Sequence, residues 1–181
     1  MVVADDEPAP LERLADDHPA PGRPAVPVTV DAPVIRAARP EDLQALVALF
    51  AADELGGHGD TCKASARADY RVAFDAIDAD PRTCLFVAEL DGRVVGTFQL
   101  VVVHSLPARG ALRALLEAVQ VDAGLRGRRI GEAMVRFAIG EARRAGAKSL
   151  ALTSNKVRLD AHRFYRRLGF ANSHEGFKIG L

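Results

Sequence analysis

The stretch VQVDAGLRGRRIGEAMVRFAIGEA, residues 119–142, decides the fold that we expect for this chain. It starts with apolar, strand-like residues, passes through a turn rich in Arg and Gly, and continues with apolar residues at steps of three and four. That spacing predicts a helix that packs one face on a sheet. The residues of this face are Ile130, Ala133, Met134, Phe137, Ala138 and Ala142.

The Arg-Gly turn has the composition of an anion-binding loop. Gly127 and Gly131 let the backbone approach a ligand closely, and the first turn of the helix presents unpaired N–H groups. Arg126, Arg128 and Arg129 add side-chain donors for phosphate oxygens. No Gly-Lys-Ser/Thr follows the turn, and the dinucleotide-binding fingerprint is incomplete. An ordinary solvated helix cap is the alternative interpretation.

The first 33 residues differ in composition from the rest of the chain. They contain seven of the ten prolines, and seven acidic residues against two Arg. Such a segment buries too little apolar surface to fold by itself. We therefore expect residues 1–33 to be a disordered acidic Pro/Ala-rich tail and residues 34–181 to form one folded domain.

The composition of the folded part excludes several classes of function. No stretch of eighteen apolar residues and no signal-peptide pattern occurs, so we expect a cytoplasmic protein with no membrane partner. Cys62 and Cys84 lack metal-ligand or disulfide spacing, which predicts free thiols and no metal site. Residues 34–181 carry a net charge of +5, which suits a polyanionic cofactor. Because no aromatic residues alternate with the Arg residues, we expect no nucleic-acid partner.

The remaining patterns predict an alternation of strands and helices. Asp91-Gly92 between two β-rich segments is the signature of a type I′ hairpin, and Ser65 is expected to cap a helix. In chain order we expect a strand at residues 34–37, a helix from Pro40, a helix after Ser65, strands at 83–90, 93–103 and 112–121, the central helix, a strand at 149–153, a helix at 160–168, and strands at 170–173 and 177–181.

Two motifs in this order resemble the GNAT superfamily of N-acetyltransferases. The turn resembles its acyl-CoA pyrophosphate loop, Q/R-x-x-G-x-G/A, with Arg126 and Gly131 in place and Arg129 where the central Gly normally stands. Residues 161–170, AHRFYRRLGF, resemble the A-x-x-F-Y-x-x-x-G-F segment of its last helix. The resemblance covers residues 34–181. It implies an α/β (α+β) fold with a mixed, mostly antiparallel sheet of six to seven strands and helices on both faces.

The resemblance also implies a site for acetyl-CoA as co-substrate. Backbone groups of Val119, Gln120 and Val121 would bind the pantetheine arm and the acetyl oxygen. The pyrophosphate would lie on the loop Arg126, Gly127, Arg128, Arg129, Ile130 and Gly131. Asn155 is either a further contact to the pantetheine or a turn residue at the entry of the last helix, and the family's usual position for that Asn is held by Arg158.

Two side chains are candidates for the proton transfers of acetyl transfer to an amine. Tyr165 matches the tyrosine that protonates the departing thiolate in many family members, with an aromatic packed beside Phe164 as the alternative. Glu117, an acid in an apolar strand, is the candidate base, with a carboxylate at the cleft edge as the alternative. Strand alternation predicts that Glu117, Val119 and Val121 share one face and Gln120 lies on the other.

The resemblance predicts an N-acetyltransferase that moves an acetyl group directly to a primary amine. Asp53, Glu54 and Asp60 in the loop after the first helix would attract a small cationic acceptor, unless they merely solvate that loop. The alternative function is a non-catalytic acyl-CoA-binding sensor or partner domain of the same fold. A homodimer is the assembly that we consider.

Overall fold

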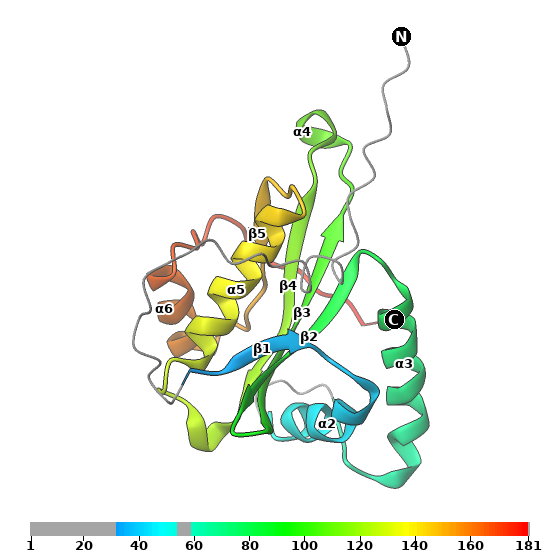
Figure 1. The fold of residues 1–181 in the computed structure, drawn as a ribbon. Coiled ribbons are helices and arrows are strands. Elements are labelled where there is room, and N and C mark those ends of the chain that lie inside the picture. Colours follow the sequence, from blue (N-terminus) through cyan, green and yellow to red (C-terminus); the bar gives the residue numbers. More distant parts are fainter. Residues whose placement is uncertain (1–31, 54–58, 181) are drawn as a thin grey trace, which may run out of the picture.

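Five strands of the computed structural model form one sheet in chain order, β1-β2-β3-β4-β5 (Figure 1). The structure describes residues 32–53 and 59–180. Neighbouring strands are antiparallel except β4 and β5, which are parallel. The strands are β1 Val34–Ala37, β2 Thr83–Leu90, β3 Arg93–Val103, β4 Arg113–Val121 and β5 Ser149–Ala151. The predicted tail lies outside the described residues, apart from residues 32 and 33.

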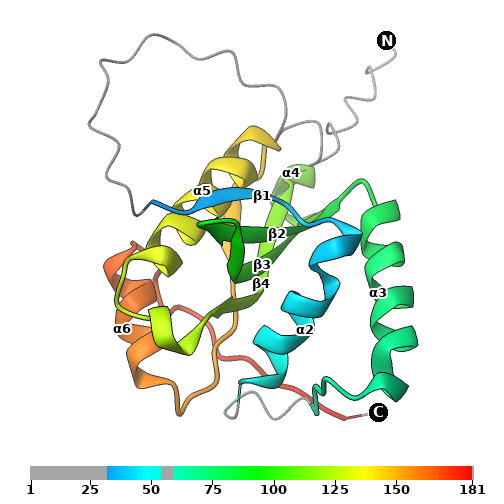
Figure 2. The same ribbon diagram turned by 60° about the horizontal axis from the view of Figure 1, so that its bottom comes forward.

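Helices cover both faces of this sheet, as predicted. Figure 2 shows α5 and α6 on one face and α2 and α3 on the other. The α-helices are α2 Leu43–Ala51, α3 Arg67–Ala79, α4 Pro107–Gly110, α5 Ile130–Arg144 and α6 Leu159–Arg167, and short 3-10 helices η1 Pro40–Asp42, η2 Ala64–Ala66 and η3 Ala123–Leu125 precede α2, α3 and α5. Within the described residues, no helix is long and apolar enough to cross a membrane.

The larger hydrophobic core lies between the sheet and α5. The predicted apolar stripe of α5 is confirmed, since Ile130, Met134, Ala138 and Ala142 are all buried. They pack on alternate residues of the strands, among them Phe86 and Phe98, whose rings stack with centroids 5.0 Å apart. Full burial of an Ile or Met side chain contributes about 1.5–3 kcal/mol. Burial of this stripe therefore fixes the N-terminus of α5 at the end of β4.

A turn and an ion pair account for two of the element boundaries. Asp91 and Gly92 both have positive φ, 51° and 73°, as a type I′ hairpin requires, so the predicted hairpin is confirmed. The prediction for Ser65 is wrong, because Ser65 lies inside η2 and α3 begins at Arg67 without a side-chain cap. A half-buried ion pair fixes the start of α2, where Arg36 donates to both Asp42 oxygens at 2.7 and 3.0 Å.

The two predicted C-terminal strands are not formed, so the sheet has five strands and not six to seven. Residues 169–180 contain no strand, and residue 181 lies outside the described part. Phe170 packs on the core, but Phe177 and Ile179 are 94% and 82% exposed, so the last predicted strand buries neither of these side chains. This extended segment leaves α6 and crosses towards α3 in both views (Figure 1, Figure 2).

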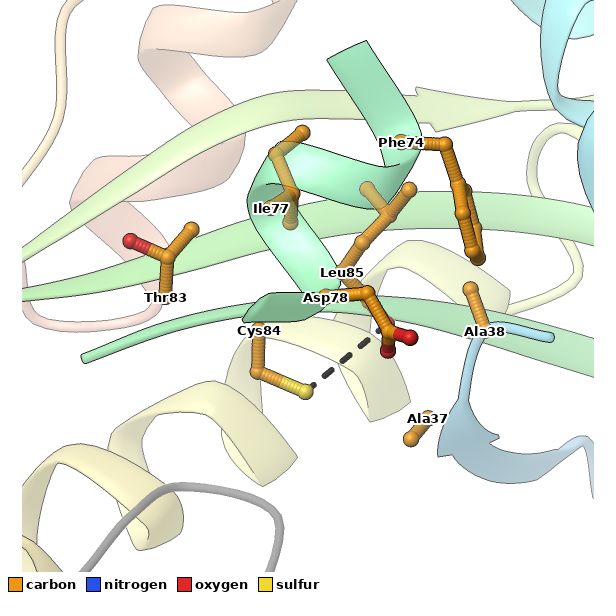
Figure 3. A pocket seen from close by; sticks show the side chains of 8 residues that line it. All are labelled: Ala37, Ala38, Phe74, Ile77, Asp78, Thr83, Cys84 and Leu85. Carbon is orange, nitrogen blue, oxygen red and sulfur yellow. Dashed lines mark hydrogen bonds between the residues drawn. The ribbon is translucent and has the colours of Figure 1, made fainter. Parts of the chain in front are cut away.

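A shallow hollow lies between α3 and the beginning of β2. Figure 3 shows that side chains such as Phe74, Ile77 and Leu85 line it, and Cys84 lies beside them with its thiol 3.8 Å from the Leu85 carbonyl oxygen. None of the predicted site residues contributes to this hollow. It is a packing feature of the α3 face, and the candidate site lies elsewhere.

Candidate functional site

The parallel strands β4 and β5 pair over only the first part of β4 and then separate. They pair only through Arg113, Ala114 and Leu115, opposite Ser149, Leu150 and Ala151. β4 continues for six more residues, to Val121, with β3 as its partner. Beyond Leu115 the β5-facing edge of β4 therefore has no strand partner among the described residues. Backbone N–H and C=O groups at such an edge can pair with an extended ligand.

A bulge at Ala118 changes which residues of β4 share a face. Ala118 has φ 51°, and two residues of β4 lie opposite Phe98 of β3, because Gln99 pairs with Glu117 and Thr97 with Gln120. Glu117 and Gln120 therefore share a face. Val119 and Val121 lie on the other face, in the α5 core.

The predicted face assignment is wrong for this reason, since simple alternation counts no extra residue. The structure places Gln120 with Glu117, and it separates both from the two valines. Left-handed backbone at a non-glycine residue costs about 1–2 kcal/mol. An Ala at this position gave no signal of a bulge.

The Arg-Gly loop follows β4 and leads into α5. Asp122 accepts a hydrogen bond from the Gly124 N–H at 2.8 Å and starts η3. Gly127 has φ 83°, a conformation for which Gly is suited. Arg129, at the position where the family pattern has Gly, has φ 62° and is also left-handed. The family pattern has Gly at this position because the loop needs a left-handed backbone there. Arg129 adopts the same conformation at a cost in free energy.

The N-terminus of α5 is the most positive part of the candidate site. Arg126, Arg128 and Arg129 are exposed, and Arg129 places no side-chain cap on the helix. Ile130 is buried and anchors the first turn, while a Cβ added to Gly131 would lie 3.5 Å from the Phe164 ring. Free N–H groups, the helix dipole and Arg donors together suit a phosphate or diphosphate.

Helix α6 places Tyr165 in an aromatic cluster. The ring centroid of Tyr165 lies 5.1 Å from that of Phe164 and 5.7 Å from that of Phe170, both edge-on. Burial raises the pKa of the Tyr165 hydroxyl, and the positive charge of Arg158 opposes this effect only in part. Tyr165 therefore stays protonated at neutral pH and can donate a proton.

A polar network that the sequence did not predict joins the end of α2, the strand β4 and the start of α6. Asp53, after α2, accepts hydrogen bonds from Arg158 Nη2 at 2.6 and 2.5 Å and from Gln120 Nε2 at 2.7 Å. Burial alone would raise the pKa of Asp53, but hydrogen bonds from Arg158 and Gln120 leave it below its ordinary value. We call these three residues the Asp53–Gln120–Arg158 network.

The sequence drew attention to two residues of this network but did not indicate that they interact. Arg158 stands out because it replaces the usual Asn, and Asp53 was assigned to an acidic loop. Asp53 and Arg158 are 105 positions apart in the sequence, and nothing in the sequence indicates that they pair. Asp53 is therefore a paired carboxylate, and Asp60 accepts a hydrogen bond from the Tyr70 hydroxyl at 2.9 Å. Glu54, the third predicted acid, lies outside the described residues.

The structure places the other two polar candidates at the surface. Glu117 is exposed on β4, on the same face as Gln120. The side-chain oxygen of Asn155 accepts a hydrogen bond from the Val157 N–H at 3.1 Å, and its carbonyl accepts one from the Arg158 N–H at 3.0 Å. Asn155 therefore acts as a turn residue before α6, which is one of the two roles weighed for it.

Comparisons with known proteins agree with this arrangement. The model of the acetyltransferase (GNAT) family matches residues 43–170. An aminoalkylphosphonate N-acetyltransferase of Salmonella typhimurium is 36% identical over 112 residues, which span 62% of this chain and 72% of that protein.

Solved structures share the fold of this chain. A crystal structure described as a transcriptional regulator from Bacillus halodurans is 36% identical and superposes with a TM-score of 0.80, over 82% of this chain and 99% of that one. A predicted acetyltransferase from Clostridium acetobutylicum, solved with acetyl-CoA, is 16% identical and has a TM-score of 0.64, over 82% and 96% of the two chains. The last likeness concerns the fold alone. With the family model covering most of the folded part, the chain belongs to the GNAT family of acetyltransferases.

Proposed function

We propose that this N-acetyltransferase transfers the acetyl group of acetyl-CoA, its co-substrate, directly to the primary amine of a small molecule. The observation that carries the proposal is the edge of β4 beyond Leu115, which lacks a β5 partner and leads into the Arg-Gly turn. An extended pantetheine arm would pair with backbone groups of Val119, Gln120 and Val121, and the diphosphate would bind at the N-terminus of α5.

The residues of the loop fit a diphosphate group in type and conformation. Arg126, Arg128 and Arg129 supply donors, and Gly127 and Gly131 keep the backbone accessible. Ile130 contributes through its N–H group in the first turn, because its side chain is buried in the core. Asn155 would act through the turn that positions Arg158 and the N-terminus of α6.

Glu117 and Tyr165 would carry the two proton transfers. An amine with a pKa of about 10.4 is neutral in only about one molecule in a few thousand at pH 7. A base must therefore accept a proton from the cationic amine before it can attack. Glu117 is exposed on β4 and can accept that proton directly or through water. As the amine nitrogen bonds to the acetyl carbon and the carbon–sulfur bond breaks, the Tyr165 hydroxyl would donate a proton to the departing sulfur.

The acceptor that we propose is a small molecule whose amine is cationic in solution. The charge of Asp53 is already offset by Arg158, so attraction to the amine would come from Glu117 and Asp60. The named activity of the Salmonella relative makes aminoalkylphosphonates the first acceptors to test, beside polyamines and aminoglycosides.

A thiol-release assay over this amine panel tests the proposal. We expect release of CoA that depends on an acceptor amine and exceeds the rate without acceptor. Tight binding of acetyl-CoA with no acceptor-dependent release for any amine would instead favour the alternative, a non-catalytic acyl-CoA-binding sensor or partner domain.

The expected cytoplasmic location and homodimer are independent of this chemistry. Light scattering on the purified chain tests the assembly, with a mass of twice 19.4 kDa as the expected result. Fractionation of cells that express the full chain tests the location.

A further inference from the structure

Arg158 is the most distinctive side chain beside the proposed chemistry. It is the N-cap residue of α6, and its ion pair with Asp53 connects the start of α6 with the end of α2. The side chain of Asp53 is 9% exposed and that of Arg158 is 24% exposed. Asp53 is therefore the buried partner, and the guanidinium of Arg158 keeps access to solvent.

The hydrogen bonds of Arg158 leave much of its donor capacity unused. Both bonds to Asp53 come from the same nitrogen, Nη2. Within residues 32–53 and 59–180, no hydrogen bond from Nε or Nη1 of Arg158 is present. A guanidinium carries five N–H donors in a planar fork that matches the oxygens of a carboxylate, phosphate or phosphonate. Asp53 thus orients the group through Nη2, and the N–H groups of Nε and Nη1 are available for a second anion.

The position of Arg158 places these N–H donors near the proposed acid and base. Arg158 and Tyr165 are seven residues apart, close to two turns of helix, so they lie on nearly the same face of α6. The charge of Arg158 acts on Tyr165. Gln120, which holds Asp53 from β4, shares its sheet face with Glu117. An anion on Arg158 would therefore lie beside the proposed acid and base.

The local charge is compatible with an anion. Asp53 offsets the charge of Arg158, and the positive charge of Arg126 also acts on Asp53. When CoA occupies Arg126, the Asp53–Arg158 pair is neutral, so the contact depends on hydrogen bonds more than on net charge. A charge-assisted hydrogen bond from the guanidinium to an oxyanion is about twice as strong as one between neutral groups.

We propose that Arg158 binds an anionic group of the acceptor, so that the preferred acceptor carries both a primary amine and a carboxylate, phosphate or phosphonate. This inference rests on the proposed function. Asp53 acts as a positioning residue because it holds Arg158, and Gln120 acts through its hydrogen bond to Asp53; neither would touch the acceptor.

The test compares three acceptors with the same carbon chain. 3-Aminopropylphosphonate carries the anion, propylamine lacks it, and 1,3-diaminopropane replaces it with a cation. For each acceptor, calorimetry with CoA-saturated protein gives the dissociation constant, and thiol release gives kcat/KM. We expect the phosphonate to bind and react at least about tenfold better than propylamine, and the diamine to be the poorest.

Variants of Arg158 assign this preference to one side chain. Arg158→Gln should reduce the phosphonate-to-propylamine ratio to about one, and Arg158→Lys should recover only part of it, because Lys keeps the charge but lacks the fixed planar donors of the guanidinium. Arg163→Gln is the matched control on α6, since Arg163 is exposed and pairs with the exposed Asp160, and it should leave the ratio unchanged. If Arg158→Gln fails to fold, the double variant Asp53→Asn/Arg158→Gln removes both charges together.

The outcomes separate this inference from the proposed function. Transfer to amines without any preference for the anionic acceptor would refute the role of Arg158 and leave the acetyltransferase proposal standing. Preferential binding of the phosphonate without turnover would refute the proposed activity alone. A loss of CoA affinity in Arg158→Gln, with an unchanged acceptor ratio, would place Arg158 in the cofactor site and overturn the inference.

Discussion

The Asp53–Gln120–Arg158 network should stabilise the fold measurably, and Asp53→Asn is the change that tests this. The Asp53 carboxylate accepts two hydrogen bonds from Arg158 and one from Gln120. Asn has the same shape but only one acceptor oxygen and no charge, and its amide N–H groups would face donors. A hydrogen bond to a charged group contributes about 1.5–3 kcal/mol, and Arg158 can regain part of this from water.

The expected net cost of Asp53→Asn is therefore about 2 kcal/mol in the free energy of unfolding. For a domain of this size that loss lowers Tm by about 4–8 °C. The lowered pKa of Asp53 gives the pH dependence its sign. The stabilisation is fully present above the ordinary carboxyl pKa, and it is lost as the pH falls through the lower folded value. The difference between wild type and variant should shrink below about pH 4.

Urea denaturation of four proteins makes the test specific. Wild type, Asp53→Asn, Arg158→Gln and the double variant form a double-mutant cycle, from which we expect a coupling energy of at least about 1 kcal/mol. Glu132→Gln is the control, because it breaks the exposed pair of Glu132 with Arg136 and should cost no more than about 0.5 kcal/mol. A coupling energy indistinguishable from zero would refute the reasoning, since it would mean that Asp53 and Arg158 do not interact in solution.

Three further predictions concern the cofactor, the acid and the fold. Arg129→Glu should weaken acetyl-CoA binding more than tenfold in calorimetry, whereas Arg143→Glu in the last turn of α5 should not. Tyr165→Phe should lower kcat about a hundredfold with little change in the KM for acetyl-CoA, and the wild-type rate should not fall until the pH exceeds about 10, because burial raises the pKa of Tyr165. Asp42→Asn should cost about 2–3 kcal/mol at pH 7 in urea denaturation by leaving Arg36 underpaired, and this cost should fade below about pH 4, since the pKa of Asp42 is lowered.

Periodicity and turn chemistry predicted most of the fold. The hairpin strands β2 and β3 have the predicted bounds, because Asp91-Gly92 fixes the turn and the flanking segments are rich in apolar and β-branched residues. The helix α5 follows from its apolar stripe. The two C-terminal strands failed because a few apolar residues in a short exposed segment define no partner for their backbone groups.

The candidate site was predicted less completely, because its decisive features depend on tertiary structure. The Arg-Gly loop and Tyr165 stood out as local motifs. The bulge at Ala118 did not, since an Ala carries no preference for positive φ, and it reversed the face assigned to Gln120. The pairing of Asp53 with Arg158 joins the end of α2 with the start of α6, and a contact of that kind leaves no periodic trace in the sequence.

Initial rates with both substrates varied test the central claim, direct acetyl transfer from acetyl-CoA to an amine, most directly. Direct transfer requires a complex of the protein with both substrates, so double-reciprocal plots should give intersecting lines. Mass spectrometry after incubation with acetyl-CoA alone should then show no acetylated protein. Parallel lines, together with an acetyl group on the exposed Cys62 thiol or another side chain, would contradict the claim, because they would show that the acetyl group passes through the protein.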